Sequence, residues 1–132
     1  MKSKIPRSDK GWKTCLSPEE FKILRNKGTE LPFTGKHNKN KKNGIYYCKG
    51  CGNKLFLSDA KFESGTGWPS FWKPASKENI ELKADNGMFM KRTEALCKKC
   101  HGHLGHVFDD GPQPTGKRYC INSIALDFKE KK

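Results

Sequence analysis

Two pairs of cysteines in C-x-x-C spacing limit what this chain can fold into more than any other feature of its sequence. Cys48 and Cys51 form one pair, in CKGC, and Cys97 and Cys100 form the other, in CKKC. Each pair suits a tight turn that directs two thiolates at one point, and two such turns supply the tetrahedral sulfur set that zinc prefers. The pattern predicts one structural Zn²⁺ ion with no open coordination position.

A metal clip, meaning a bound metal ion that joins distant segments, would suit this chain because its core must be small. Only 33% of its 132 residues are hydrophobic, which leaves little apolar surface to bury. The two cysteine pairs lie far apart in the sequence, and closing a long loop is where a clip constrains the unfolded chain most. A redox dithiol pair and an iron–sulfur cluster are alternative uses of the same cysteines.

Covalent haem attachment is a further alternative for the second cysteine pair. CKKCH matches the C-x-x-C-H pattern, with Met88 and Met90 as conceivable axial ligands. This use leaves Cys48 and Cys51 unexplained, and the first residues hold no apolar run of the kind found in export signals. A purified sample without a Soret band would exclude it.

The charge of the chain is strongly positive, with 27 basic and 14 acidic residues and a net charge of +13. Such a charge alone would suit a partner made of nucleic acid or a membrane surface. The lysines are spread along the chain, however, so we expect a solvated surface and neither of these partners. We expect a cytoplasmic location, where paired cysteines hold metal or do redox chemistry more often than they form structural disulfides.

A short helix is expected near the amino terminus, over residues 17–28. Ser17 suits the N-cap, Pro18 the first turn, Glu20 the capping box and Gly28 the terminator. The residues expected to face the core are Phe21 and Leu24.

The rest of the chain predicts a mainly β fold within a single domain of residues 1–132. Short apolar runs between turn signals favour antiparallel strands. The expected strands are residues 45–48, 54–57, 88–95, 105–108 and 118–126. Residues 1–15 are expected to be a mobile segment and residues 129–132 a frayed basic tail.

Cys120 is a candidate nucleophile. On a strand, Arg118, Cys120 and Asn122 share one face. A guanidinium beside a thiol lowers its pKa and raises the thiolate fraction. The alternative is a buried, inert cysteine.

Two further segments carry candidate site residues. HGHLGHVFDDG places His101, His103 and His106 where they could donate protons, ligate metal or lie in an exposed loop. SGTGWPSFW places Trp68 and Trp72 beside a glycine-rich loop, which suits either an apolar pocket for a methyl group or the core.

These segments together resemble a known family. SGTGWPSF, HLGHVFDDGP and RYCINS, with the paired C-x-x-C motifs, are similar to the methionine-R-sulfoxide reductase B family, as is LSPEEFKILRNKGTELPFTG at residues 16–35. The resemblance spans residues 16–128. It implies two small antiparallel sheets clipped by zinc away from the chemistry, and reduction of methionine-R-sulfoxide in peptides or proteins.

The resemblance also implies residue roles. Cys120 falls on the nucleophile and Trp68 on the residue that packs against the substrate methyl group, with Phe108 as a second expected substrate contact. The expected polar set is His103, His106, Asp110, Arg118 and Asn122. Asp109 is adjacent to Asp110 and leaves that assignment open, and His103 is favoured as the acid, with His106 orienting the sulfoxide.

Recycling is where the chain departs from the family pattern. Reduction of the substrate leaves a sulfenic acid on Cys120, and many family members carry a resolving cysteine in SGCGWPS, where this chain has Thr66. Cys15 is the candidate replacement, forming a disulfide with Cys120 that thioredoxin reduces. Direct reduction of the sulfenic acid by an external thiol is the alternative.

Two rival functions use the same residues. A zinc-ribbon module could bind single-stranded nucleic acid through Trp68, Phe71 and Trp72. A structural zinc domain could bind a protein partner. Both leave Cys120 and the histidines without a role.

Overall fold

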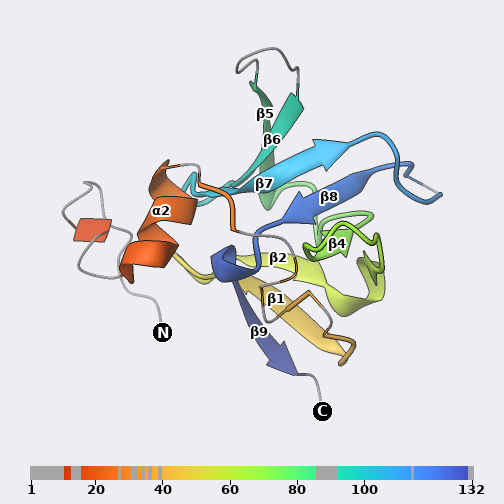
Figure 1. Cartoon of the computed structure of the whole chain (residues 1–132), viewed down its shortest axis with the longest axis horizontal. Helices are drawn as coiled ribbons and strands as arrows, with labels where there is room; N and C mark the ends of the chain where they lie inside the picture. Colours follow the sequence, from red (N-terminus) through yellow and green to blue (C-terminus); the bar gives the residue numbers. More distant parts are fainter. Residues whose placement is uncertain are drawn as a thin grey trace.

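Two antiparallel sheets and a short helix form the fold (Figure 1), in a computed structural model that describes residues 11–12, 16–26, 28–30, 33, 35, 37–38, 40–85, 92–113 and 115–130. The smaller sheet has the strand order β2-β1-β9 and the larger one β3-β4-β8-β7-β6-β5. The elements are α2 (Pro18–Asn26), β1 (Gly44–Cys48), β2 (Lys54–Leu57), η1 (Ser58–Ala60), β3 (Lys61–Phe62), β4 (Ser70–Phe71), β5 (Ile80–Asp85), β6 (Arg92–Cys97), β7 (His103–Phe108), β8 (Arg118–Ile121), η2 (Ser123–Ala125) and β9 (Leu126–Glu130). This architecture confirms the expected mainly β fold.

Helix α2 begins with the capping box that the sequence predicts. The Glu20 amide donates to Ser17 Oγ over 3.1 Å, and the Ser17 amide donates to Glu20 Oε1 over 2.9 Å. Phe21 and Leu24 are buried, as expected. The helix ends shortly before Gly28 and packs against β7 and η2, close to the segment that carries Cys120.

Most expected strands are present, with shifted ends. β1 and β2 match the predictions closely, and β7 begins two residues earlier than expected. β6 runs on to Cys97, whereas the expected start of that strand falls in residues 86–91, outside the described residues. The larger sheet also contains β3, β4 and β5, which were not predicted.

The prediction of one strand over residues 118–126 is wrong. β8 ends at Ile121, η2 follows, and β9 then pairs with β1 in the other sheet. Long-range contacts cause the break, because Asn122 Nδ2 donates to the Leu104 carbonyl over 3.0 Å and the Ile124 amide donates to a Glu30 oxygen over 2.9 Å. β9 also extends to Glu130, so residues 129 and 130 of the expected frayed tail belong to a strand, and the rest of that segment lies outside the described residues.

Aromatic side chains join the two sheets. Phe71 of β4 in the larger sheet stacks on Phe56 of β2 with ring centroids 4.2 Å apart, and Tyr46 of β1 meets Phe71 edge-on at 5.2 Å. All three rings are fully buried. Since β4 pairs with β8, this cluster also anchors the strand that carries Cys120.

Among the described residues, no helix combines the length and the apolar character needed to cross a membrane.

Candidate active site and metal centre

The four paired cysteines meet at one buried cluster to which both sheets contribute. Cys48 ends β1 of the smaller sheet and Cys97 ends β6 of the larger one, while Cys51 and Cys100 lie in the turns that follow. All four residues are buried, and their sulfur atoms lie within 4.8 Å of one another. The structure therefore brings together the four residues that the sequence assigned to a metal.

The two turns that carry these cysteines share one backbone geometry. In the first turn, Gly52 has a φ of 80° and its amide donates to the Cys48 carbonyl over 2.8 Å. In the second turn, His101 has a φ of 63° and its backbone amide donates to the Cys97 carbonyl over 2.7 Å. A positive φ is uncommon outside glycine, so the surrounding structure holds His101 in a conformation that glycine adopts freely.

The sulfur positions fit a tetrahedral metal ion. The Sγ atoms of Cys48 and Cys100 are 3.7 Å apart, and those of Cys51 and Cys97 are 3.4 Å apart. A tetrahedral site with metal–sulfur bonds of about 2.3 Å has edges of about 3.8 Å. Asn53 Nδ2 lies 3.6 Å from Cys97 Sγ, an amide contact of the kind that steadies a metal-bound thiolate. The cluster could hold a metal ion with four protein ligands.

Cys120 lies near the middle of the larger sheet. It belongs to β8, which pairs with β4 on one side and β7 on the other. The residues opposite it in register are Ser70 of β4 and His106 of β7. Arg118 and Asn122 lie two positions before and after Cys120, so alternation along the strand directs all three side chains to one face, as the sequence predicts.

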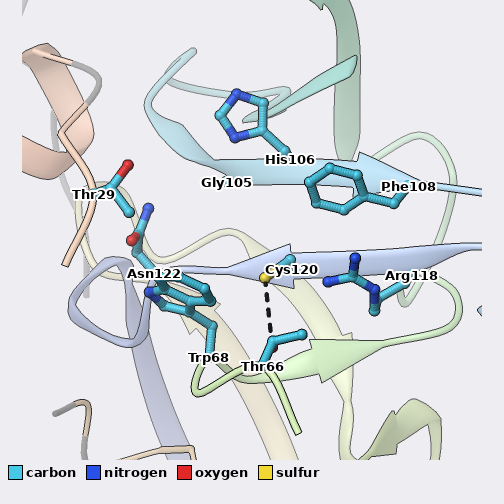
Figure 2. Close-up of a pocket in the computed structure, with 9 residues that line it drawn as sticks. All are labelled: Thr29, Thr66, Trp68, Gly105, His106, Phe108, Arg118, Cys120 and Asn122. Atoms are coloured by element: carbon cyan, nitrogen blue, oxygen red, sulfur yellow. Dashed lines mark hydrogen bonds between the residues drawn. The ribbon is translucent and has the colours of Figure 1, made fainter. Parts of the chain in front are cut away.

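This face opens on a cavity of about 230 Å³ (Figure 2). Residues of β7 and β8, the loop before β4 and the segment after α2 contribute to its wall. The lining residues are Thr29, Thr66, Trp68, Gly105, His106, Phe108, Arg118, Cys120 and Asn122. The cavity therefore combines most of the expected site residues, and none of the four clustered cysteines lies among its lining residues.

Burial raises the pKa of the Cys120 thiol above its ordinary value, because the thiolate is poorly solvated there. The Thr66 hydroxyl and the Arg118 guanidinium act in the opposite direction, and the Asp110 carboxylate adds to the rise. The contribution of Arg118 thus has the sign that the sequence predicted, but burial outweighs it. This direction favours the protonated thiol over the thiolate.

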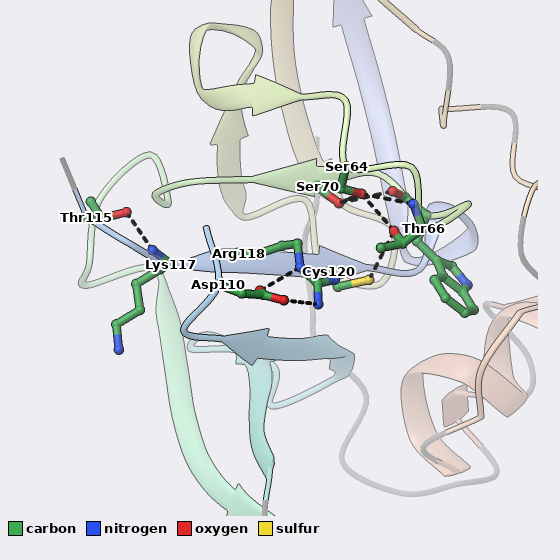
Figure 3. Close-up of polar contacts among 9 residues, drawn as sticks. Ser64, Thr66, Ser70, Asp110, Thr115, Lys117, Arg118 and Cys120 are labelled. Atoms are coloured by element: carbon green, nitrogen blue, oxygen red, sulfur yellow. Dashed lines mark hydrogen bonds and ion pairs between the residues drawn. The ribbon is translucent and has the colours of Figure 1, made fainter. Parts of the chain in front are cut away.

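Arg118 connects the cavity to an outer carboxylate. Its Nε and Nη2 atoms donate to the two oxygens of Asp110 over 2.9 and 3.2 Å, and this pairing lowers the pKa of Asp110 (Figure 3). The guanidinium also lies over the Phe108 ring, 4.4 Å from its centroid. Asp109 pairs with Lys117 instead. Asp110 is therefore the carboxylate that fixes the orientation of Arg118.

The two candidate acids occupy different positions. His106 lines the cavity, whereas His103 is 2% exposed and does not. His103 Nδ1 lies 2.8 Å from Glu94 Oε2, and its ring meets that of His106 edge-on at a centroid distance of 5.4 Å. His106 can thus contact a bound molecule, with His103 and Glu94 behind it. Cys15, the candidate resolving thiol, lies outside the described residues.

Glu30 is a residue of the site that sequence reasoning missed. Its carbonyl accepts the Trp68 indole N–H over 3.0 Å, and its amide donates to Asn122 Oδ1 over 3.0 Å. The residue is 6% exposed, and burial raises the pKa of its carboxyl group although backbone amides of η2 oppose the shift. One residue therefore positions two walls of the cavity, and no local sequence pattern identifies it.

Glu30→Ala is expected to lower the free energy of unfolding by about 1–3 kcal/mol, because the Ile124 amide loses its carboxylate acceptor. The same change loosens the backbone of residue 30, whose carbonyl binds the Trp68 indole and whose amide binds the Asn122 side chain. The KM for substrate should therefore rise. Urea denaturation and initial rates measure both effects. Glu30→Gln keeps an acceptor oxygen and is expected to restore most of the loss, and an Ala variant as stable as the parent would contradict this role.

A half-buried thiol in an aromatic and cationic cavity, together with a separate cluster of four cysteines that could hold a metal ion, defines a class of thiol proteins with a cysteine-rich structural site. Comparison with known proteins narrows this class. The SelR domain matches residues 16–130. The peptide methionine sulfoxide reductase MsrB of Methanosarcina mazei is 56% identical over 126 residues, which cover 96% of this chain and 90% of that protein. The protein of the same name from Leptospira interrogans is 53% identical over 130 residues, covering 98% and 99%.

The chain belongs to the SelR-domain, methionine-R-sulfoxide reductase B family, as its sequence motifs indicated.

Proposed function

We propose that this chain reduces methionine-R-sulfoxide in peptides and proteins to methionine and so repairs oxidised proteins. Family membership supports peptide-methionine (R)-S-oxide reductase activity. The observation that carries the proposal is that half-buried Cys120 opens on a cavity shared with an indole, an imidazole and a guanidinium.

The proposed reaction moves one oxygen atom from the sulfoxide to Cys120. The Cys120 sulfur attacks the sulfoxide sulfur and forms a transient sulfur–sulfur bond. That bond and the sulfur–oxygen bond of the substrate then break, as the oxygen forms a new bond to the Cys120 sulfur. The substrate sulfur gains two electrons and the Cys120 sulfur loses two. With the thiol proton on the transferred oxygen, the products are methionine and a Cys120 sulfenic acid.

Trp68 and Phe108 are proposed to hold the methyl group of the substrate. Both rings line the cavity, and aromatic faces and edges suit thioether and methyl groups. A sulfoxide is chiral, so its methyl group, oxygen and chain each need a separate wall. The R epimer follows from family membership.

His106 is proposed to donate a proton to the sulfoxide oxygen as it is transferred and to take up the proton of the Cys120 thiol in its place, because an imidazole can exchange protons near neutral pH and this ring reaches the cavity. The sequence favoured His103 for this role. The His103 ring lies behind that of His106, with its Nδ1 at Glu94. His103 is therefore better placed to position His106 than to donate a proton to the substrate. The alkaline limb of the pH–rate profile, where the acid loses its proton, separates the two assignments. His106→Asn should remove this limb, and His103→Asn should only lower the rate. The reverse result would restore His103 as the acid.

The metal is proposed to be one structural Zn²⁺ ion per chain, held by Cys48, Cys51, Cys97 and Cys100. The sulfur spacing and the buried thiol donors support this choice, because a tetrahedral set of thiolates favours zinc. When bound, the ion joins the two sheets and has no position open for substrate.

Recycling is proposed to run through a disulfide between Cys15 and Cys120, which thioredoxin or a similar reductant in a reducing compartment then opens. Thr66 stands where many family members carry the resolving cysteine, which leaves Cys15 as the only other thiol outside the metal cluster. Disulfide mapping by mass spectrometry after one equivalent of sulfoxide tests this route. A Cys15→Ser variant that recycles at full speed would reject it.

A thioredoxin-coupled assay on separated R and S epimers of a methionine sulfoxide peptide tests the function as a whole. Turnover of the R epimer alone is expected. Absence of turnover with either epimer, in protein that is folded and metal-loaded, would overturn the proposed function.

A further inference from the structure

Three hydroxyl groups lead from Cys120 to a backbone carbonyl (Figure 3). Thr66 Oγ1 lies 4.0 Å from Cys120 Sγ, and Ser64 Oγ lies 2.8 Å from Thr66 Oγ1. Ser70 Oγ lies 2.7 Å from Ser64 Oγ and donates to the Trp68 carbonyl over 3.2 Å. We call Thr66, Ser64 and Ser70 the hydroxyl chain.

The carbonyl at its far end gives the hydroxyl chain a direction. A carbonyl only accepts, so Ser70 uses its one proton on the Trp68 oxygen. Ser70 must then accept from Ser64, and Ser64 must accept from Thr66. The Thr66 oxygen is left to accept from the Cys120 thiol. In this direction every hydroxyl proton has an acceptor and Cys120 carries its proton.

The opposite direction suits a thiolate. When the Cys120 proton leaves for the reacting substrate, Thr66 can rotate to donate to the sulfur, Ser64 to Thr66, and Ser70 to Ser64. Each hydroxyl keeps its own proton. The Trp68 carbonyl alone loses a bond, and that bond is longer than either contact between hydroxyl oxygens.

We infer that the hydroxyl chain holds Cys120 as a thiol at rest and reverses to donate a hydrogen bond to the thiolate when it forms. Its members are positioning residues that act on the nucleophile. The inference rests on the proposed function only in taking Cys120 as the reacting group. It also gives a role to Thr66, which in this chain occupies the position where many family members carry the resolving cysteine.

Other groups also face Cys120 and must be held constant in a test. Arg118 of β8 and its partner Asp110 act on the sulfur, and His106 of β7 lies opposite it in register. Burial is the largest influence on its pKa. None of these groups is altered by changing a hydroxyl on the β4 side.

The two ends of the hydroxyl chain are expected to act on Cys120 in opposite directions. Thr66→Val removes the donor to the thiolate, so alkylation of Cys120 by iodoacetamide at pH 7 should slow about fivefold. Ser70→Ala removes the link that fixes the resting direction, so alkylation should speed up about fivefold, with its pH midpoint moved lower. Ser64→Ala is expected to act like Ser70→Ala and serves as a second variant if Ser70→Ala does not fold.

The measurement is the pH profile of alkylation at the Cys120 peptide, read by mass spectrometry in metal-loaded protein with Cys15→Ser. Ser76→Ala is the matched control, because the Ser76 hydroxyl accepts the Glu78 amide over 3.3 Å outside the cavity, and its profile should match the parent. Shifts of the same sign for Thr66→Val and the serine variants, or no shift in any of them, would overturn the inference. Alkylation needs no sulfoxide, so failure of the proposed function shows separately in the coupled assay.

Discussion

Cys120→Ser is expected to lower the turnover of methionine-R-sulfoxide by about a thousandfold or more while leaving the fold intact. A hydroxyl is a far weaker nucleophile than a thiol and cannot accept the oxygen as a sulfenic acid. The substitution changes one atom on a half-buried strand residue, so packing against β4 and β7 should survive. Initial rates in the coupled assay measure the loss of turnover, and metal content and thermal unfolding show whether the fold is intact.

Leu82→Ser is a suitable control for this experiment. Leu82 is 51% exposed on β5, at the far edge of the larger sheet from β4, so this variant should keep full turnover. Turnover by Cys120→Ser close to that of the parent would remove Cys120 as the nucleophile, whatever the state of the metal.

Cys97→Ser is expected to have the largest effect on stability, with a Tm at least about 10 °C lower and most of the metal lost. Cys97 ends β6 and lies 3.4 Å, sulfur to sulfur, from Cys51 beside β1 and β2. Removing this ligand opens the clip between the two sheets. The remaining cysteines of the cluster would then be buried without a bound metal ion. Thermal unfolding and metal analysis check the result.

Cys120→Ser is the matched control for Cys97→Ser, because it makes the same chemical change at a cysteine outside the cluster. It should keep one equivalent of metal and the parental Tm. A Cys97→Ser protein with full metal content and an unchanged Tm would contradict the structural role of the four-cysteine cluster.

The elements that the sequence predicted well are those set by neighbouring residues. The capping box of Ser17 and Glu20 needs only four consecutive positions, and both of its hydrogen bonds are present. The four-cysteine cluster was predictable for a similar reason. Each C-x-x-C turn is local, and the chemistry of four thiols implies a shared site.

The elements that the sequence did not predict depend on distant contacts. β5 is an exception, because the residues of Ile80–Asp85, IELKAD, alternate between apolar and polar, a pattern that favours a strand and that the prediction overlooked. The break after Ile121 depends on Glu30 and on the Leu104 carbonyl, both far away in the sequence.

Some features of the candidate site were likewise predictable from neighbouring residues, whereas others depend on distant contacts. Alternation along a strand was enough to bring Arg118, Cys120 and Asn122 to one face. The direction of the Cys120 pKa shift was not predictable, because burial by residues distant in the sequence outweighs the one cation visible in the sequence. The different positions of His103 and His106 depend on how β7 packs, which their spacing does not specify.

Trapping the oxidised cysteine tests the central claim most directly. The Cys15→Ser protein is mixed with one equivalent of the R or S epimer of a methionine sulfoxide peptide in the presence of dimedone, and every cysteine peptide is then mapped by mass spectrometry. We predict one dimedone adduct, on Cys120, with the R epimer and none with the S epimer. Methionine formed in stoichiometric amount with Cys120 unmodified would contradict the account.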